Sequence, residues 1–427
     1  MKKTMILVMT ICLIFSGTLL WAAGGQAGGG ASGQVTIEMT QWWQPEMPAG
    51  SFEKVISDFE ARNPNIRVNT INLPYSQVLE QLTVGGATGT LSDVYGMNPP
   101  WLRDFIRQGI IEPLDEYIAR DNYDMSQLAT TLEIEGNHWM FPVSIFLTAV
   151  YYNVDHFRAV GLTGTPATRE EFVEYARRLT VPARNQYGWV IPLGLANPNG
   201  SQHEVLNWAW AGGHRALRDG RPNVDNPGVA SAVAHIQTLY RDGLVVPGAF
   251  TKVEQEKIED FSSGRTSMLI SSNAHINLLR QRNPNLNFDI FRLPSPAGFT
   301  GRPAVSISAW WISMFQRGRN KDAAWQLVKH FLDVDQNSHM ASNANSFPGN
   351  RNSRPDFVTA DDLFAKFYEI FQTSELLNEF NGLPNAPGLQ RAFVEELHAL
   401  LENRQDVNAT LRNTQARWQR VFAEAGL

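Results

Sequence analysis

The chain has 427 residues but only one cysteine, Cys12, which lies inside an apolar N-terminal run. If export removes that run, no thiol remains, which excludes disulfides, cysteine metal sites and cysteine nucleophiles. Basic residues are not in excess, since 36 Lys and Arg face 42 Asp and Glu for a net charge of −6. We therefore expect no nucleic-acid partner. No apolar segment beyond the N-terminus is long enough to cross a bilayer.

Familiar catalytic patterns are also missing. The sequence contains no Gly-x-Ser-x-Gly, His-Glu-x-x-His or Gly-x-x-x-x-Gly-Lys-Ser/Thr stretch, and His203-Glu204 lacks the second histidine of a zinc helix. We expect no cofactor, no metal and no enzymatic activity. The main alternative to a protein without enzymatic activity is a secreted glycoside hydrolase, because its catalytic site needs only two carboxylates. Pairs such as Glu46 and Asp93 do not by themselves favour it, because 42 acidic residues offer many such pairs.

The first residues have the order of a secretory signal peptide. Lys2 and Lys3 precede an apolar stretch over residues 5–20, and small residues follow it. Residues 1–23 are therefore predicted to be a signal peptide, and the low-complexity residues 24–33 a flexible leader. A retained N-terminal anchor is the alternative.

The cleavage position stays open, because Ala22, Ala27 and Ala31 are all suitable. Lipid-anchored binding proteins carry their cysteine directly after a small residue at the cleavage site. Here Ile11 precedes Cys12 and the apolar run continues beyond it, so no lipid anchor is expected.

About 400 residues follow, which is more than one hydrophobic core usually serves, so two domains are expected. Period-2 and period-3.6 apolar patterns alternate along the chain and predict an α/β fold built on a largely parallel sheet. Strands are predicted at 35–39, 66–71, 92–97, 150–152, 266–270, 288–291 and 310–315. Helices are predicted at 52–59, 78–82, 102–106, 168–179, 229–240, 321–332 and over most of the chain from residue 361.

Several segments in order resemble the sugar-binding family of extracellular solute-binding proteins, the group that includes maltose-binding protein. They are residues 52–68, 92–94, 109–115, 141–143, 151–153, 157–172, 261–268 and 320–325. Each segment is weak alone, but their order and spacing span nearly the whole predicted mature chain.

The resemblance implies a two-lobed periplasmic binding protein fold of the type II kind, with a ligand cleft between lobes joined by crossover hinge segments. Carried over from the family, lobe 1 would hold residues 34–144 plus 302–345. Lobe 2 would hold residues 145–301 plus 346–427. The implied function is that of the periplasmic substrate-binding component of an ABC importer, a monomer that delivers a sugar or oligosaccharide to the transmembrane permease subunits.

A sugar site needs aromatic platforms for the apolar ring faces and polar groups for the hydroxyl rim. The sequence has 12 Trp, and several follow predicted strands, where α/β folds present ligand loops. Trp189 and Trp325, in apolar stretches, are expected to lie in the core instead. The candidate ligand-binding residues are Trp42, Trp43, Gln44, Asn98, Trp101, Ser144, Phe146, His203, Trp208, Asn273 and Trp310.

Other ligands stay open. A peptide, a polyamine or an iron complex would suit the same fold, but iron favours clustered Tyr and His, and amines favour clustered carboxylates. The sequence shows neither cluster. The segments at 98–100, 144–146 and 271–275 also differ from maltose-type relatives, which argues against a maltodextrin.

Overall fold

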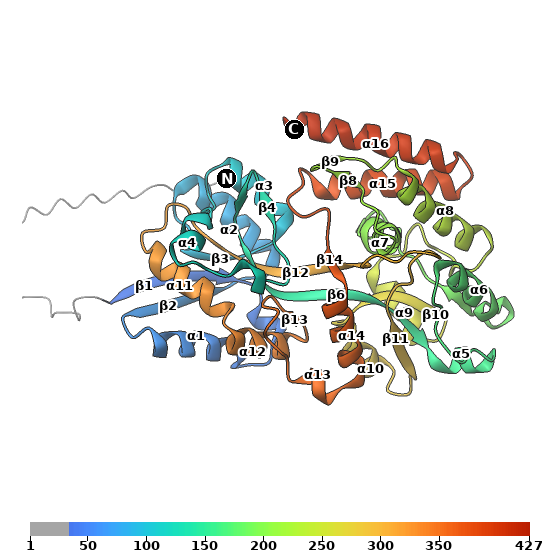
Figure 1. The fold of residues 1–427 in the computed structure, drawn as a ribbon, viewed down its shortest axis with the longest axis horizontal. Coiled ribbons are helices and arrows are strands. Elements are labelled where there is room, and N and C mark those ends of the chain that lie inside the picture. The colour runs from blue at the N-terminus through green and yellow to red at the C-terminus, as the bar shows by residue number, and fades with distance from the viewer. Residues whose placement is uncertain (1–33) are drawn as a thin grey trace, which may run out of the picture. The chain divides into compact units, whose positions relative to one another are not determined.

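The computed structural model describes residues 34–427, and Figure 1 shows a long central sheet with helices on both sides. The predicted signal peptide, the leader and Cys12 lie outside the described residues. Within the part described, no helix is both long and apolar enough to span a membrane.

The central sheet has ten strands within residues 34–427. Along its main path they are β2 (Ile66–Asn72), β1 (Val35–Gln41), β3 (Val94–Met97), β12 (Ala304–Met314), β6 (Phe141–Asn153), β10 (Thr266–Ser272) and β7 (Tyr187–Trp189). Beside this path, β11 (Phe288–Phe291) and β13 (Phe347–Pro348) pair with β6, and β14 (Glu375–Leu377) pairs with β12. Two small hairpins stand apart, β4 (Glu133–Ile134) with β5 (Asn137–His138) and β8 (Leu217–Arg218) with β9 (Arg221–Pro222).

The prediction of a largely parallel sheet was wrong, because the sheet is mixed. Strand β1 pairs in parallel with β2 and β3, as the βαβ pattern predicts. Strand β6, however, is antiparallel to β10, β11, β12 and β13, and β12 is antiparallel to β3. The two longest strands, β6 and β12, run side by side through the middle of the molecule and belong to both halves of the sheet. A local periodicity cannot reveal this long-range pairing.

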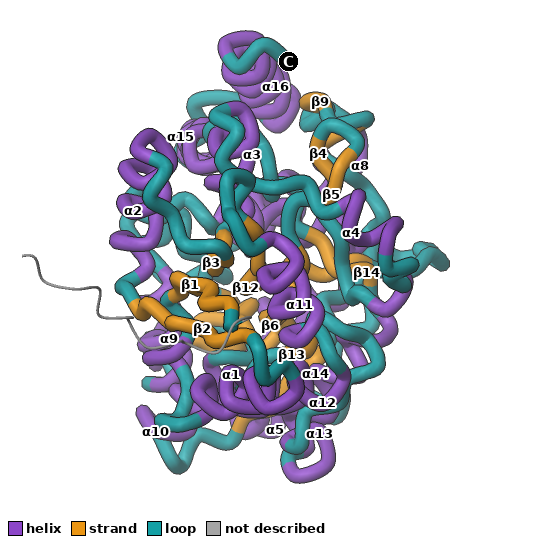
Figure 2. The backbone as a smooth tube through the Cα atoms, turned by 90° about the vertical axis from the view of Figure 1, so that its left-hand side faces the viewer, coloured by secondary structure: helices purple, strands orange, loops and turns teal. Residues whose placement is uncertain are grey.

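Helices cover both faces of the sheet. In Figures 1 and 2, α1 and α12 lie on one face of the first half, while α2 and α3 lie on the other. The N-terminal helices are α1 (Ser51–Arg62), α2 (Tyr75–Thr88), α3 (Pro99–Arg107) and α4 (Asp115–Arg120). The middle helices are α5 (Val154–Ala159), α6 (Arg169–Leu179), α7 (Asn207–Ala211), α8 (Pro227–Arg241), α9 (Glu254–Ser262) and α10 (His275–Arg282). The C-terminal helices are α11 (Lys321–Phe331), α12 (Val334–Ala344), α13 (Phe357–Ala360), α14 (Asp362–Thr373), α15 (Ala386–Leu401) and α16 (Val407–Glu424).

Local signals account for several helix ends. Thr168 Oγ1 accepts a hydrogen bond from the backbone N–H of Glu171 at 3.2 Å, as the capping pair predicts. The Glu171 carboxylate reaches back one residue further than expected, to the N–H of Ala167 at 2.7 Å. After α3, Gly109 takes φ +62°, the left-handed conformation in which glycine ends helices at little cost.

The apolar residues form separate cores. One contains β1 to β3, α1 to α3 and α11 to α12, and includes the fully buried Trp325. A second contains α6 to α8, α15 and α16, and includes the fully buried Trp189. A third lies under the middle of β6 and β12 and contains α14. The core positions predicted for Trp189 and Trp325 are thus confirmed, whereas the lobe boundaries at 144/145, 301/302 and 345/346 stay a prediction.

Candidate ligand-binding cleft

Two adjoining cavities lie where β6 and β12 run side by side. The first, called the acidic cavity below, has a volume of about 360 Å³ and is lined by Glu46, Phe146, Thr148, Pro192, Asn197, Asn199, Gly200, His203, Glu204, Glu254, Lys257, Ser271, Ser272, Ala274, His275, Ser308 and Trp310. The second, called the aromatic cavity, has a volume of about 460 Å³ and is lined by Tyr75, Leu79, Asn98, Pro99, Pro100, Trp101, Asn199, Gln202, His203, Ser308, Ala309, Asn378, Phe380, Asn381, Ala386, Pro387 and Gln390. Asn199, His203 and Ser308 line both cavities, so the two adjoin; together they are called the cleft below.

The alternation of side chains along β6 and β12 determines which residues form the floor of the cleft. Phe146 on β6 stands opposite Ser308 on β12, and directly opposed residues of an antiparallel pair share a face. Ile145 and Ile307, the residues that precede Phe146 and Ser308 along the two strands, point to the other face and are buried in the third core. The register shifts between Trp310 and Trp311, and this irregularity in β12 lies at the edge of the acidic cavity.

A π-helical turn, η4 (Ser201–Leu206), carries polar residues into the cleft. Such turns are rare and frequent at functional sites. A Cβ on the preceding Gly200 would lie 2.0 Å from the carbonyl oxygen of Pro192, so only glycine fits this approach. Behind the turn, Asn207 ties α7 to both long strands: its Nδ2 donates to Thr148 Oγ1 at 3.1 Å and its Oδ1 accepts from the N–H of Ser306 at 3.1 Å.

His203, on the same turn, lies between the two cavities. Its Nδ1 is 2.9 Å from Ser306 Oγ on β12. Burial lowers the pKa of His203 to about 4, so the imidazole is neutral at pH 7. It can therefore both donate and accept hydrogen bonds in the cleft.

A buried ion cluster forms one wall of the acidic cavity. The Lys257 ammonium donates to Glu204 Oε1 at 2.8 Å and to the carbonyl oxygen of Ile270 at 2.7 Å, and it forms an ion pair with Glu254 Oε2 at 2.8 Å. The side chains of Glu204 and Lys257 are 1% and 2% exposed, whereas Glu254 is 39% exposed. Burial would lower the pKa of Lys257, but the two carboxylates outweigh it and raise that pKa. Burial raises the pKa of Glu204 to about 7, against the opposing effect of Lys257.

Aromatic side chains line the same cavity. Trp310 stacks on Trp43 with ring centroids 5.7 Å apart and contacts Phe146 edge-on at 5.4 Å. Further along, Tyr75 and Trp101 lie 4.8 Å apart beside the aromatic cavity. Rigid aromatic surface next to amide, hydroxyl and carboxylate groups is suited to a ligand with both apolar faces and a polar rim.

Five of the predicted site residues line the cleft. Asn98 and Trp101 line the aromatic cavity, Phe146 and Trp310 line the acidic cavity, and His203 lines both. Asn98 Nδ2 also donates to the hydroxyl of Tyr75. Ligand contact by these five residues stays a prediction.

Three other predicted residues lie beside the cleft without lining it. Trp42 is 7% exposed and packs edge-on against Tyr75 and Trp101 at 5.2 and 5.8 Å, so it supports the platform from behind. Trp43 is fully buried beneath Trp310. Gln44 Nε2 donates instead to Glu53 Oε1 at 2.6 Å.

The remaining three predicted residues are fully buried away from the cavity walls. Ser144 lies in β6 between Trp310 and Pro348. Trp208 packs against Phe172 and His235 in the second core. Asn273 accepts from the N–H of Leu147 at 2.8 Å and donates to the carbonyl oxygen of Asn345 at 2.7 Å, which connects β10 to β6 and to the end of α12.

Most of the charged residues that line the acidic cavity were not predicted from the sequence. Glu46, Glu204, Glu254 and Lys257 come from three distant segments, and the conclusion that no carboxylates cluster was wrong. The adjacent His203 and Glu204 are a local signal for this cavity, but without a second histidine they do not indicate a metal site. Within residues 34–427, no group of three or more His, Cys, Asp or Glu side chains is arranged to hold a metal ion.

The fold and the cleft define a protein of the two-lobed, ligand-binding class. The chain belongs to the bacterial extracellular solute-binding protein family, whose sequence pattern it matches over residues 43–337. The resemblance inferred from the sequence is thereby confirmed, as is the two-lobed α/β fold.

Individual relatives are distant. A binding protein of Brucella abortus (strain 2308) is 29% identical over 306 residues, which is 70% of this chain and 72% of that protein. The galactooligosaccharide-binding protein of Bacillus subtilis (strain 168) is 22% identical over 343 residues, which is 78% of this chain and 77% of that protein.

Two solved structures share the fold over nearly the whole chain. The sugar-binding protein MalE from Xanthomonas citri has a TM-score of 0.78 at 19% identity and covers 92% of this chain and 98% of its own. The cyclic alpha-maltosyl-1,6-maltose binding protein from Arthrobacter globiformis has a TM-score of 0.80 at 18% identity, with 92% and 100% covered.

Proposed function

We propose that this protein is the periplasmic substrate-binding component of an ABC importer, and that it binds a sugar or oligosaccharide in the cleft. The observation that carries the proposal is the single cleft lined both by aromatic rings and by convergent polar side chains. Galactooligosaccharide-binding and multiple sugar-binding proteins among the relatives support it.

The arrangement of β6 and β12 suggests how binding would be coupled to delivery. Glu46, Tyr75 and Trp101 belong to predicted lobe 1, whereas His203 and Lys257 belong to predicted lobe 2. A ligand that contacts both sets stabilises a closed arrangement, with the two long strands as the connection. Shifting a closed-to-open ratio from 1:99 to 99:1 requires about 5.5 kcal/mol of differential binding. The closed form would then present a single surface to the permease.

The proposal includes export by a cleavable signal peptide, no lipid anchor, a monomeric state and no turnover. A glycosidase needs carboxylates placed to protonate and attack a glycosidic bond. In the acidic cavity, Glu204 and Glu254 are instead held by the Lys257 ammonium.

The test is a thermal-shift screen of mono- and oligosaccharides, followed by calorimetry and small-angle scattering on the purified mature protein. We expect at least one sugar to raise the melting temperature, to bind with a 1:1 stoichiometry, to compact the protein and to be recovered unchanged. Hydrolysis of the sugar would establish an enzyme. Stabilisation by peptides or polyamines alone would also refute the proposal.

A further inference from the structure

The acidic cavity has more negative charge than a neutral sugar requires. Its lining includes three carboxylates, Glu46, Glu204 and Glu254, and one ammonium, Lys257. The two histidines that line it, His203 and His275, both have pKa values lowered by burial. With both histidines neutral, the lining has a formal charge of −2 when all three carboxylates are ionised; the raised pKa of Glu204, about 7, makes the mean charge at pH 7 less negative but leaves more carboxylates than cations.

The single cation of this lining is already paired with protein groups. The Lys257 ammonium donates hydrogen bonds to Glu204 and to the backbone carbonyl of Ile270, and it forms an ion pair with Glu254 at 2.8 Å. An anionic group in the cavity would thus meet carboxylates without a compensating charge. This excludes sugar acids and sugar phosphates from the acidic end of the cleft.

The carboxylates, in contrast, retain acceptors. Glu204 is 1% exposed, yet its Oε2 has no hydrogen-bond partner among the described residues. A buried carboxylate oxygen without a partner is costly, and it points to a donor that arrives with the ligand. Within residues 34–427, the side chain of Glu46 likewise makes no hydrogen bond or ion pair with the protein, so its charge is not neutralised from within.

The aromatic residues of the same cavity suit a cation as well. Phe146 and Trp310 line it together with the carboxylates, and the faces of aromatic rings attract ammonium groups. The aromatic cavity differs, because its lining contains amides and rings but no carboxylate. The cleft is therefore polarised along its length, with one acidic end and one neutral end.

We propose that the ligand is an amino sugar or an oligosaccharide with an amino-sugar unit, and that its protonated amine lies in the acidic cavity. This inference rests on the proposed sugar-binding function and adds the charge of the ligand to it. A primary ammonium brings three donors and a positive charge, which match the unpartnered Glu204 Oε2 and the two other carboxylates. Neutral units of the ligand extend over Tyr75 and Trp101.

The experiment compares sugars that differ only in a hydroxyl or an ammonium group. Glucosamine, galactosamine and the β-1,4-linked di- to tetrasaccharides of glucosamine are titrated by calorimetry beside their glucose and galactose counterparts, at pH 6.5 and low salt. We expect at least one amine to bind tenfold or more tightly than its hydroxyl counterpart, a difference of about 1.4 kcal/mol. We also expect the preference to shrink at high salt, because screening weakens charge interactions.

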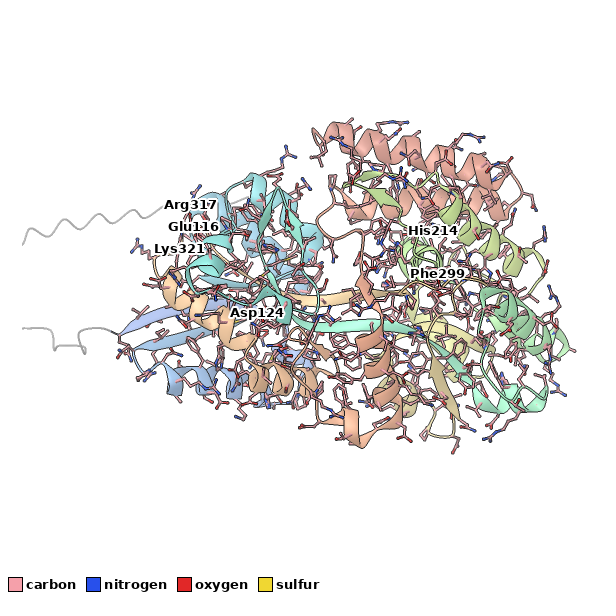
Figure 3. The ribbon with its side chains drawn as sticks, in the orientation of Figure 1. Glu116, Asp124, His214, Phe299, Arg317 and Lys321 are labelled. Carbon is pink, nitrogen blue, oxygen red and sulfur yellow. The ribbon has the colours of Figure 1, made fainter. Side chains whose placement is uncertain are left out.

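Glu46→Gln tests the charge at the site itself, because that side chain has no structural partner within residues 34–427. The variant is expected to lower the preference for the amine at least threefold without changing the melting temperature of the unliganded protein. Glu116→Gln removes the same charge from the outer part of the first half of the molecule, away from the cleft (Figure 3), and is expected to leave the preference unchanged. If Glu46→Gln impairs folding, Glu254→Gln takes its place.

The outcomes separate the two proposals. Neutral sugars that bind as tightly as their amines would overturn the amino-sugar inference and leave sugar binding standing. An amine preference that both Glu46→Gln and Glu254→Gln leave intact would also overturn it. If no sugar of either kind binds, the proposed function fails, and the inference fails with it.

Discussion

Removing the ammonium of the buried ion cluster should destabilise the protein strongly, and more so at high pH. In Lys257→Met the Glu204 carboxylate, 1% exposed, loses the one ion-pair partner that it has within residues 34–427. At 2.8 Å and an effective dielectric of about 20, the attraction between the two charges is about 6 kcal/mol. Desolvation of both ions offsets part of it, so the expected loss in the free energy of unfolding is about 3–5 kcal/mol at pH 8.

The pH dependence follows from the titration of Glu204. Burial holds the folded-state pKa of this carboxyl, about 7, above its unfolded value of about 4.3, and loss of Lys257 raises it further. Between these two values the folded state binds more protons than the unfolded state, so stability falls as the pH rises. At pH 5 Glu204 in the variant takes up a proton, and the loss should shrink to about 1–2 kcal/mol.

Urea unfolding followed by circular dichroism at pH 5 and pH 8 measures both values. Lys54→Met is the matched control, because Lys54 pairs with Asp58 at 2.6 Å but is 56% exposed. Its expected effect is below about 1 kcal/mol. The double variant Glu204→Met/Lys257→Met should recover most of the lost stability, since apolar pairs of similar volume often replace buried ion pairs at little cost. A loss below about 1 kcal/mol in Lys257→Met at pH 8 would refute the reasoning.

Three further predictions concern the cleft. Ser308→Phe should abolish binding of any sugar found in the screen, because Ser308 lines both cavities and is exposed. Ser308→Ala should lower the affinity less than threefold. Calorimetry measures both affinities, and full affinity in Ser308→Phe would contradict the assignment of the cleft. Trp101→Ala should weaken sugar binding at least tenfold. Trp189→Phe, in the second core, should change the melting temperature but not the affinity. Equal losses of affinity in the two variants would show that Trp101 is not a platform for the ligand. Gly200→Ala should destabilise the free protein, because its Cβ would lie 2.0 Å from Pro192 O; an unchanged melting temperature would show that the turn can shift.

The sequence predicted most elements of the fold because their signals are local. The predicted strand at 288–291 coincides with β11, and the predicted helix at 321–332 coincides with α11 to within one residue. Apolar side chains at period 2 or 3.6 suffice for such elements. The strand predicted at 310–315 is instead the end of an eleven-residue strand, β12, whose first residues reach into the other half of the sheet. Its mixed pairing depends on partners between 71 and 220 residues away.

The candidate site was predicted unevenly for the same reason. Trp101, Phe146 and Trp310 could be proposed because aromatic residues in or beside apolar, strand-like segments are visible in the sequence. Their neighbour Trp43 has the same local signal, yet it lies buried beneath Trp310, because only packing decides which ring faces the cleft.

The sequence by itself determined the α/β class, the family and the position of most helices and strands, since those depend on periodicity and on ordered short segments. Only the tertiary structure decided the character of the cleft. It brings Glu46, Glu204 and Glu254 to one cavity and pairs Lys257 with Glu204 and Glu254. The charge that remains for a ligand is a property of side chains assembled from distant segments, and no single segment carries it.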